Sequence, residues 1–216
     1  ASWEDIIADG TGAAGFLLAR FARGRKPATA SLFLLAGFAL LTGSAWPVIA
    51  ATQAVVHRNH QFPVIFNGDI DSESSFVSAR DNRMEARRDE SLGTIYTGVE
   101  VTGGGALGIE IRDLVPDWTG YSVLNLDLGI ESGQGMELTV RVHDRFHRRG
   151  DQPHNDRFNR RFNLPAGRST LRIPLVDIEN APIGRKMDMT DIDALVIFSG
   201  VLENSRTIRL YEISLD

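Results

Sequence analysis

The sequence predicts a mainly β protein, an antiparallel β-sandwich of the jelly-roll type preceded by two transmembrane α-helices. Three observations indicate this fold class. No Asp, Glu, Lys or Arg occurs between Lys26 and Arg58. From residue 62 onward, apolar and polar residues alternate in short runs, as they do in strands that bury one face. Glycine-rich breaks such as 103–105 and 131–135 separate these runs, and turn signals at this spacing are typical of sandwiches.

The first element is a helix predicted over residues 5–22. Asp5 and Asp9 lie one turn apart on one face of it. An ionisable group at membrane depth is a functional hypothesis by default, whereas a helix N-terminus at the interface would favour the same charge, so both interpretations of Asp9 stay open. Residues 10–15 match the dinucleotide-binding pattern GxGxxG, but that pattern needs a preceding strand and a later acidic residue. Packing glycines are therefore the better interpretation.

The second element is a helix predicted over residues 28–57. A helix rises about 1.5 Å per residue, so roughly 20 residues cross a bilayer core. Burying one charge there would cost about 2.5–3.5 kcal/mol on insertion scales. The preceding loop, 20–26, holds four positive charges, and positive loops stay cytoplasmic. We therefore expect residues 59–216 outside the cytoplasm. A cleaved signal peptide ending near Ala50 and Ala51 is the alternative, for which the apolar stretch is too long.

These elements divide the chain into a membrane segment, residues 1–58, and one extracytoplasmic domain, residues 59–216. The first part carries five Lys and Arg residues against three Asp and Glu, and the second carries 18 against 25. An acidic domain argues against a nucleic-acid partner, which requires a basic face. The chain has no cysteine, which excludes disulfides and thiolate metal sites.

The domain is predicted to contain about ten short strands and two brief helical turns, at 177–180 and 189–192. The expected strands cover residues 62–66, 75–79, 94–101, 108–112, 122–128, 136–146, 157–164, 169–174, 194–198 and 207–215. The strand over 136–146 shows the alternation most clearly. Its inward set is Leu138, Val140, Val142 and Phe146, and its outward set is Thr139, Arg141, His143, Arg145 and His147.

Residues 143–163 carry the clearest chemistry, because three of the five histidines lie there. Gly150 and Pro153 indicate a loop at the centre of the segment, so its flanks are predicted to pair as a hairpin. The face opposite Phe158 and Phe162 would then present a row of donors suited to hydroxyls, carboxylates or phosphates. The predicted ligand-binding residues are His143, Arg145, His147, Arg157, Asn159 and Arg161.

A solvated, salt-bridged outer face is the alternative interpretation of this row. On the inner face, Asp144, Asp156 and Arg160 are expected to pair with one another, because buried charges need partners. A zinc ion held by His143 and His147 is not expected, since four strand residues span about 13 Å.

Aromatic and metal-binding candidates lie elsewhere in the chain. Trp118 and Tyr121 are predicted to offer a surface on which a sugar ring stacks, with edge packing as the alternative. The acidic stretch 69–73 does not fit the EF-hand template, which requires Gly at its sixth position and Glu at its twelfth. No cofactor is predicted, and structural calcium elsewhere in the sandwich stays open.

Residues 2–15 read Ser-Trp-Glu-Asp-Ile-Ile-Ala-Asp-Gly-Thr-Gly-Ala-Ala-Gly. This stretch resembles the late membrane helix of VanZ-like proteins, in which an Asp, a second polar residue and a run of small residues recur. The basic loop and the long apolar helix would be the last membrane crossing. The resemblance covers the C-terminal part of such a membrane domain. The family takes its name from an association with resistance to the glycopeptide antibiotic teicoplanin.

The second part of the chain resembles the extra domain of some bacterial VanZ-like proteins. That domain is itself similar to carbohydrate-binding jelly rolls of the galactose-binding type. Residues 143–145, 156–159 and 185–189 carry this resemblance. It implies a bacterial inner (cytoplasmic) membrane location, with residues 59–216 on the periplasmic side.

We therefore predict a membrane-anchored module that binds cell-envelope glycan, with membrane lipid as a second partner. A protein-interaction module for an envelope protein is one alternative. A membrane part that handles a lipid-linked intermediate, with Asp5 or Asp9 in its mechanism, is another. The hydrolase patterns GxSxG and HExxH do not occur in the sequence, so a binding role is favoured over catalysis.

Overall fold

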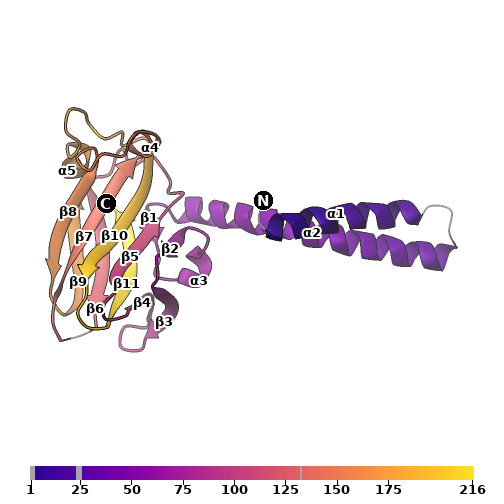
Figure 1. The fold of residues 1–216 in the computed structure, drawn as a ribbon, viewed down its shortest axis with the longest axis horizontal. Coiled ribbons are helices and arrows are strands. Elements are labelled where there is room, and N and C mark those ends of the chain that lie inside the picture. The colour runs from indigo at the N-terminus through magenta and orange to yellow at the C-terminus, as the bar shows by residue number, and fades with distance from the viewer. Residues whose placement is uncertain (1–2, 23–25, 132) are drawn as a thin grey trace. The chain divides into compact units, whose positions relative to one another are not determined.

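The structure is a computed structural model that describes residues 3–22, 26–131 and 133–216. The chain forms two compact units, Ala1–Val56 and His57–Asp216 (Figure 1). Asp5 and Asp9 belong to the first helix, but their side chains lie outside the described part of the chain.

The first unit is built from α1 (Trp3–Phe21) and the first part of α2 (Pro27–Gln61). The helices pack closely where two glycines meet. A Cβ atom on Gly15 would lie 2.8 Å from the carbonyl oxygen of Gly37, and one on Gly37 would lie 2.8 Å from that of Gly15. Side chains at these positions would push the backbones apart, so Gly15 is a packing residue, as the sequence predicts.

One stretch of the described chain, Thr29–Trp46 in α2, is long and apolar enough to cross a membrane. Its mean hydropathy is 1.5, and 6% of it is buried. Two spanning helices were expected from the sequence. The sequence of α1 includes Glu4, Asp5 and Asp9, and charged groups of this kind lower the hydropathy of a helix.

The contact between α1 and α2 can be tested with an introduced disulfide, because the chain has no cysteine of its own. A Cβ on Gly12 would lie 3.8 Å from the Cβ of Ser44, within the roughly 3.5–4.5 Å that a disulfide requires. Gly12→Cys combined with Ser44→Cys is expected to oxidise to a crosslink. Mass spectrometry of a tryptic digest reports it, since Arg20 and Lys26 separate the two positions.

The control variant combines Gly12→Cys with Gly43→Cys. A Cβ on Gly43 has no heavy atom within 4 Å, so this pair is expected to stay reduced. Equal crosslinking of both pairs, or of neither, would contradict the packing of α1 on α2.

The second unit is a sandwich of two sheets whose paired strands all run antiparallel. The first sheet has the strand order β3-β4-β11-β6-β9, with β1 paired to β11, and the second has the order β2-β5-β10-β7-β8. The strands of the first sheet are β1 (Val64–Phe66), β3 (Arg83–Asp89), β4 (Thr94–Val101), β6 (Val123–Ile130), β9 (Gly167–Pro174) and β11 (Arg206–Leu215). Those of the second are β2 (Val77–Ala79), β5 (Ala106–Ile111), β7 (Met136–Asp144), β8 (Phe158–Leu164) and β10 (Ile192–Val201).

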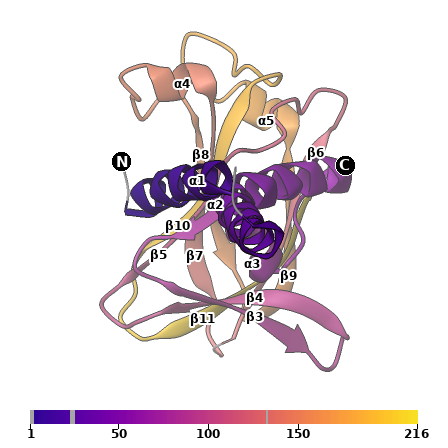
Figure 2. The same cartoon turned by 90° about the vertical axis from the view of Figure 1, so that its right-hand side faces the viewer.

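Among the residues that the structure describes, three short helices lie between strands: α3 (Ile70–Glu73), α4 (Arg145–Arg149) and α5 (Leu175–Glu179). Figures 1 and 2 both place α4 and α5 at the same end of the sandwich. The predicted helical turn at 177–180 corresponds to α5. The one predicted at 189–192 is instead a turn that leads into β10. The edge strand β3, which reads Arg-Met-Glu-Ala-Arg-Arg-Asp, was not predicted, because it lacks the apolar alternation that marks a buried face.

The core fills the space between the sheets and follows the period-two pattern. Leu138, Val140 and Val142 are each 0% exposed, as the alternation in β7 predicts. Phe146 was predicted to continue this inward row, and that prediction is wrong, because its exposure is 67%. The strand ends at Asp144, whose side chain accepts a hydrogen bond from the backbone N–H of His147 and caps α4.

Candidate ligand-binding site

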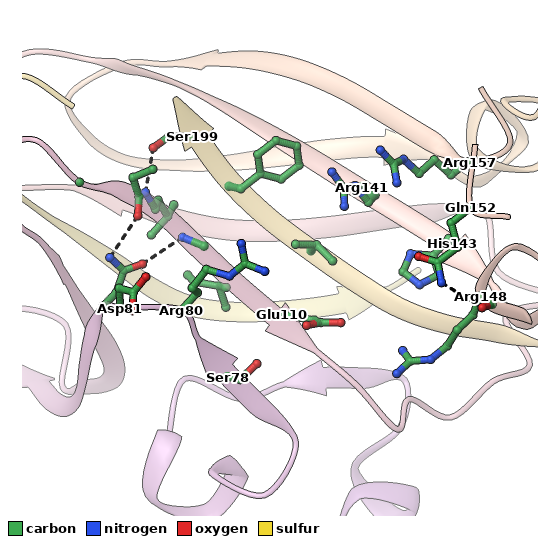
Figure 3. Close-up of a pocket in the computed structure, with 18 of the residues that line it drawn as sticks. Ser78, Arg80, Asp81, Glu110, Arg141, His143, Arg148, Gln152, Arg157 and Ser199 are labelled. Carbon is green, nitrogen blue, oxygen red and sulfur yellow. Dashed lines mark hydrogen bonds between the residues drawn. The ribbon is translucent and has the colours of Figure 1, made fainter. Parts of the chain in front are cut away.

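A cavity of about 670 Å³ opens on the outer face of the β2-β5-β10-β7-β8 sheet (Figure 3). The alternation that sends Val140 and Val142 into the core turns Arg141 and His143 to this outer face. The neighbouring strands also turn side chains to this outer face, namely Ser78 on β2, Glu110 on β5 and Phe198 on β10. The lining side chains with polar or aromatic groups are those of Ser78, Arg80, Asp81, Asn82, Thr102, Glu110, Arg141, His143, His147, Arg148, Gln152, Arg157, Phe198 and Ser199.

Strand register places the floor residues in rows across the sheet. Glu110 lies opposite Val196, and Val196 lies opposite Arg141. The next row includes Phe198, which faces Gly108 on one side and Thr139 on the other. Adjacent strands are about 4.8 Å apart, so the side chains of one row lie next to one another across the cavity floor.

One end of the cavity is fixed by hydrogen bonds between side chains and backbone. Asn82 accepts a hydrogen bond from Gly108 N at 3.0 Å and donates to Ala106 O at 3.2 Å. Ser199 Oγ accepts from Leu107 N at 3.0 Å. These contacts hold the chain after β2 and the irregular end of β10 against β5.

The other end is fixed by charged groups around α4. Arg185 donates to Asp144 Oδ1 at 2.9 Å and to Asp156 Oδ2 at 2.9 Å. Asp156 in turn lies 3.3 Å from His147 Nδ1, and His147 is 2% exposed. This network holds the segment that carries Arg148 and Gln152 toward the cavity. It also corrects the sequence prediction that Asp144, Asp156 and Arg160 pair together, because Arg160 pairs with Asp177 instead.

His143 is a buried acceptor candidate at the cavity wall, with 9% of its surface exposed. Burial lowers the pKa of His143, neighbouring His147 lowers it further, and Asp193 opposes the change. Burial and the neighbouring His147 thus favour the neutral form of the ring. His143 Nε2 lies 3.3 Å from Asp193 Oδ2, while Nδ1 has no hydrogen-bond partner among the described residues. A ring that donates from Nε2 leaves Nδ1 as an acceptor.

The rings of His143 and His147 have centroids 5.1 Å apart. The sequence-based distance of about 13 Å was wrong, because His147 lies on α4 rather than on an extended strand. Within the described residues, no three His, Asp or Glu side chains gather closely enough to hold a metal ion.

Two arginines lie beside His143 on the cavity floor (Figure 3). Arg141 stacks its guanidinium over Phe198, with 4.7 Å from Cζ to the ring centroid, and its Nε lies 3.5 Å from Asn159 Oδ1. Arg157 Nε is buried without a hydrogen-bond partner in the described chain. Burial lowers the pKa of both guanidinium groups, and the charge of Arg157 lowers that of Arg141 further.

Glu110 adds an ionised acceptor to the same floor. A hydrogen bond from Arg112, 2.5 Å long, lowers the pKa of Glu110, although burial opposes this. The floor therefore offers both hydrogen-bond donors and acceptors, together with the apolar ring of Phe198.

The structure brings some of the predicted site residues to this cavity and separates others. His143, His147 and Arg157 line it. Asn159 and Arg161 lie on the same face of β8 but outside the lining, with the Arg161 side chain 75% exposed. Arg145 is not among the residues that line the cavity, and it pairs with Asp191.

Neither aromatic residue predicted to stack on a sugar lines the cavity. Trp118 is 1% exposed in the core, and its Nε1 donates to Val115 O at 3.1 Å. Tyr121 is half-buried and packs edge-to-face on Phe62, with centroids 5.4 Å apart. The ring at the cavity is Phe198, which sequence reasoning missed because the pairing of β10 with β7 leaves no local signal.

No family model matches the sequence, and no curated protein matches it. Solved structures with a similar fold include an exo-beta-agarase, with a TM-score of 0.50 and 15% identity. The match covers 66% of this chain and 23% of the agarase, so this chain spans less than a quarter of that enzyme.

Two carbohydrate-binding modules of cellulosomal cellulases from Clostridium thermocellum are also similar. The family 30 module has a TM-score of 0.48 and 14% identity, over 71% of this chain and 95% of the module. The family 11 module has a TM-score of 0.46 and 12% identity, over 65% and 86%. At such identities the likeness concerns the fold alone, a mainly β antiparallel two-sheet sandwich resembling these jelly rolls.

Proposed function

We propose that residues 57–216 bind a saccharide in the cavity of the β2-β5-β10-β7-β8 sheet. The observation that carries this proposal is the composition of the cavity floor. A sugar hydroxyl both donates and accepts hydrogen bonds, and the floor presents Arg141 as a donor beside the carboxylate of Glu110 as an acceptor. The C–H groups of a sugar ring favour an aromatic surface, which Phe198 supplies. In small-molecule sites, polar groups that converge beside an apolar surface fix the orientation of the ligand.

Glycan of the bacterial cell envelope is the proposed ligand class, and the inner membrane, with the sandwich on its periplasmic side, is the proposed location. The apolar stretch Thr29–Trp46 supports a membrane anchor. A second crossing by α1, and membership of the VanZ-like family with a link to glycopeptide resistance, rest on the sequence resemblance. Deletion of residues 1–56 should release the chain from membranes on fractionation, and retention would argue against this anchor.

The saccharide proposal is tested with the full chain, solubilised in a zwitterionic detergent that has no sugar head group. Calorimetry against bacterial envelope glycans, including peptidoglycan fragments, should give saturable binding to one class. Phe198→Ser should weaken that binding by about fivefold or more, because losing one aromatic contact costs about 1 kcal/mol.

Leu92→Ser is the matched control, since Leu92 is 51% exposed and lies between β3 and β4 in the other sheet. This variant should bind as the unmodified chain does. No binding by a folded chain across the panel would overturn the proposal and favour an envelope protein as partner. Equal loss in both variants would overturn the assignment of the site to this cavity.

A further inference from the structure

The cavity carries an excess of positive charge within an acidic chain. The formal net charge of the chain is −5. Its cavity side chains of fixed charge are the cations Arg80, Arg141, Arg148 and Arg157 and the anions Asp81 and Glu110. The excess is therefore local, and a ligand that enters the cavity meets it directly.

Part of this charge is already compensated by neighbours. Arg148 donates to Asp193 at 2.8 Å, and Glu110 accepts from Arg112 at 2.5 Å. Arg80, Arg141 and Arg157 form no ion pair within the described part of the chain, and of these three Arg141 and Arg157 lie beside His143 on the cavity floor (Figure 3). Glu110 attracts Arg141 across the sheet, but it shares its charge with Arg112, which donates to one of its two oxygens, Oε2.

Arg157 shows most clearly that a partner is missing. It lies directly before β8, and the register of β7 with β8 brings it level with His143. Its Nε is buried and unsatisfied among the residues that the structure describes, and a buried donor without an acceptor costs free energy. The guanidinium of Arg141 is close enough to be destabilised by the Arg157 charge. An oxyanion between the two guanidinium groups would compensate both positive charges and remove the repulsion.

We propose that the cavity selects glycans that carry an oxyanion, a carboxylate or a sulfate, and that Arg141 and Arg157 hold this group. The inference rests on the proposed saccharide site and specifies its ligand class. Guanidinium forks match the two oxygens of such a group, whereas a neutral sugar would leave both charges uncompensated. Phe198 and Glu110 remain free to contact the sugar ring and its hydroxyls.

The test uses matched pairs of oligosaccharides that differ only in the anionic group. Hexamers of galacturonate and mannuronate are compared with their methyl esters, and sulfated galactan hexamers with their desulfated forms. Binding to the full chain is measured in the detergent described above. We expect the acidic member of one pair to bind at least about tenfold more tightly, with an affinity that falls as salt is raised. The pair that responds distinguishes carboxylate from sulfate.

Substitutions then locate the site. Arg141→Gln and Arg157→Gln should each remove about tenfold of affinity for the acidic glycan and should lower affinity for its neutral counterpart by less, so that the ratio of the two affinities falls. Arg157→Lys should recover part of the loss, since it restores the charge but not the fork. Arg172→Gln is the control, because Arg172 lies on β9 of the other sheet with a 62% exposed side chain.

Each further outcome decides between the two proposals. Equal affinity for acidic and neutral members would overturn the anion inference and leave the saccharide site standing. An acidic preference that survives in Arg141→Gln and Arg157→Gln, with unchanged thermal unfolding, would also overturn it. Absence of binding to every glycan would overturn the saccharide site itself, and the inference with it.

Discussion

Replacing Arg185 by methionine is expected to lower the free energy of unfolding of the sandwich by about 3–5 kcal/mol. That is the cost typical of removing one partner from a buried ion pair, because the remaining charge is left uncompensated. The Arg185 side chain is 21% exposed and contacts two carboxylates, of which Asp144 is 0% and Asp156 is 15% exposed. Methionine retains most of the side-chain volume, so lost charge rather than a cavity dominates the effect.

The effect of Arg185→Met should extend from the ion pairs to the end of the cavity near α4. Asp144 caps α4 through the backbone N–H of His147, and Arg185 fixes the position of Asp144. Without that guanidinium, α4 and the following loop are expected to loosen, and Arg148 and Gln152 lie on them. Hydrogen exchange of residues 145–152 should therefore speed up in Arg185→Met more than exchange in β4 or β6.

The effect should depend on pH in a defined direction. Burial alone would raise the pKa of Asp144, but hydrogen bonds from Arg185 and from the backbone of Asp188 and His147 lower it overall. Hydrogen bonds from Arg185 likewise lower the pKa of Asp156. Carboxylates with a lowered folded-state pKa stabilise the fold above their unfolded value, near 3.9, and lose that contribution as pH falls through the folded value. Without Arg185, burial would raise the pKa of Asp144 above that unfolded value, so the difference between Arg185→Met and the unmodified chain should be largest at neutral pH and should shrink as the buried carboxyl of the variant becomes protonated on acidification.

Urea unfolding of the full chain measures these energies, with Trp3 and Trp46 replaced by Phe so that Trp118 is the sole tryptophan, whose fluorescence is followed. Lys186→Met is the control, because Lys186 has a 67% exposed side chain and pairs with Glu179 at the surface. It should change the free energy by less than about 0.5 kcal/mol. Similar midpoints for Arg185→Met and Lys186→Met at pH 7 would show that the network contributes little.

The sequence determines the strands better than the connections between them. The burial of Leu138, Val140 and Val142 follows from local alternation, which depends on residues two positions apart. The break at Asp144 does not, because the cap of α4 is stabilised by Arg185, which lies 41 positions further along the chain. A period-two pattern that continues through Arg145 and Phe146 therefore gives no sign that the strand has ended.

In the candidate site, too, residues close together in sequence could be predicted, whereas residues brought together by distant strands could not. His143 and Arg157 could be predicted because both flank one hairpin, where pairing follows from proximity in sequence. Phe198 and Glu110 could not, since β10 and β5 join β7 only through the order of strands in the sheet. Trp118 was misplaced for a related reason. An aromatic residue beside a turn reads as exposed when the segments that cover it are distant in sequence.

Trp118→Ala is accordingly expected to lower the free energy of unfolding by about 3–5 kcal/mol, the range for deleting a large buried aromatic side chain. Trp118 is 1% exposed within the core cluster. Its indole Nε1 donates to Val115 O, and its backbone N–H donates to Met189 O at 2.8 Å. Trp118→Phe keeps much of the ring but loses the indole hydrogen bond, so it should cost less.

The two aromatic positions should separate stability from binding. Trp118→Phe should bind glycan as the unmodified chain does, because the ring lies in the core and not at the cavity. Phe198→Ser should weaken glycan binding. It should lower the free energy of unfolding less than Trp118→Ala does, because the Phe198 side chain is only half-buried. Urea unfolding followed by circular dichroism, together with calorimetry on each variant, measures both properties. A Trp118→Phe chain that unfolds normally but no longer binds glycan would show that Trp118 supplies the stacking surface, and that Phe198 on the β2-β5-β10-β7-β8 face does not.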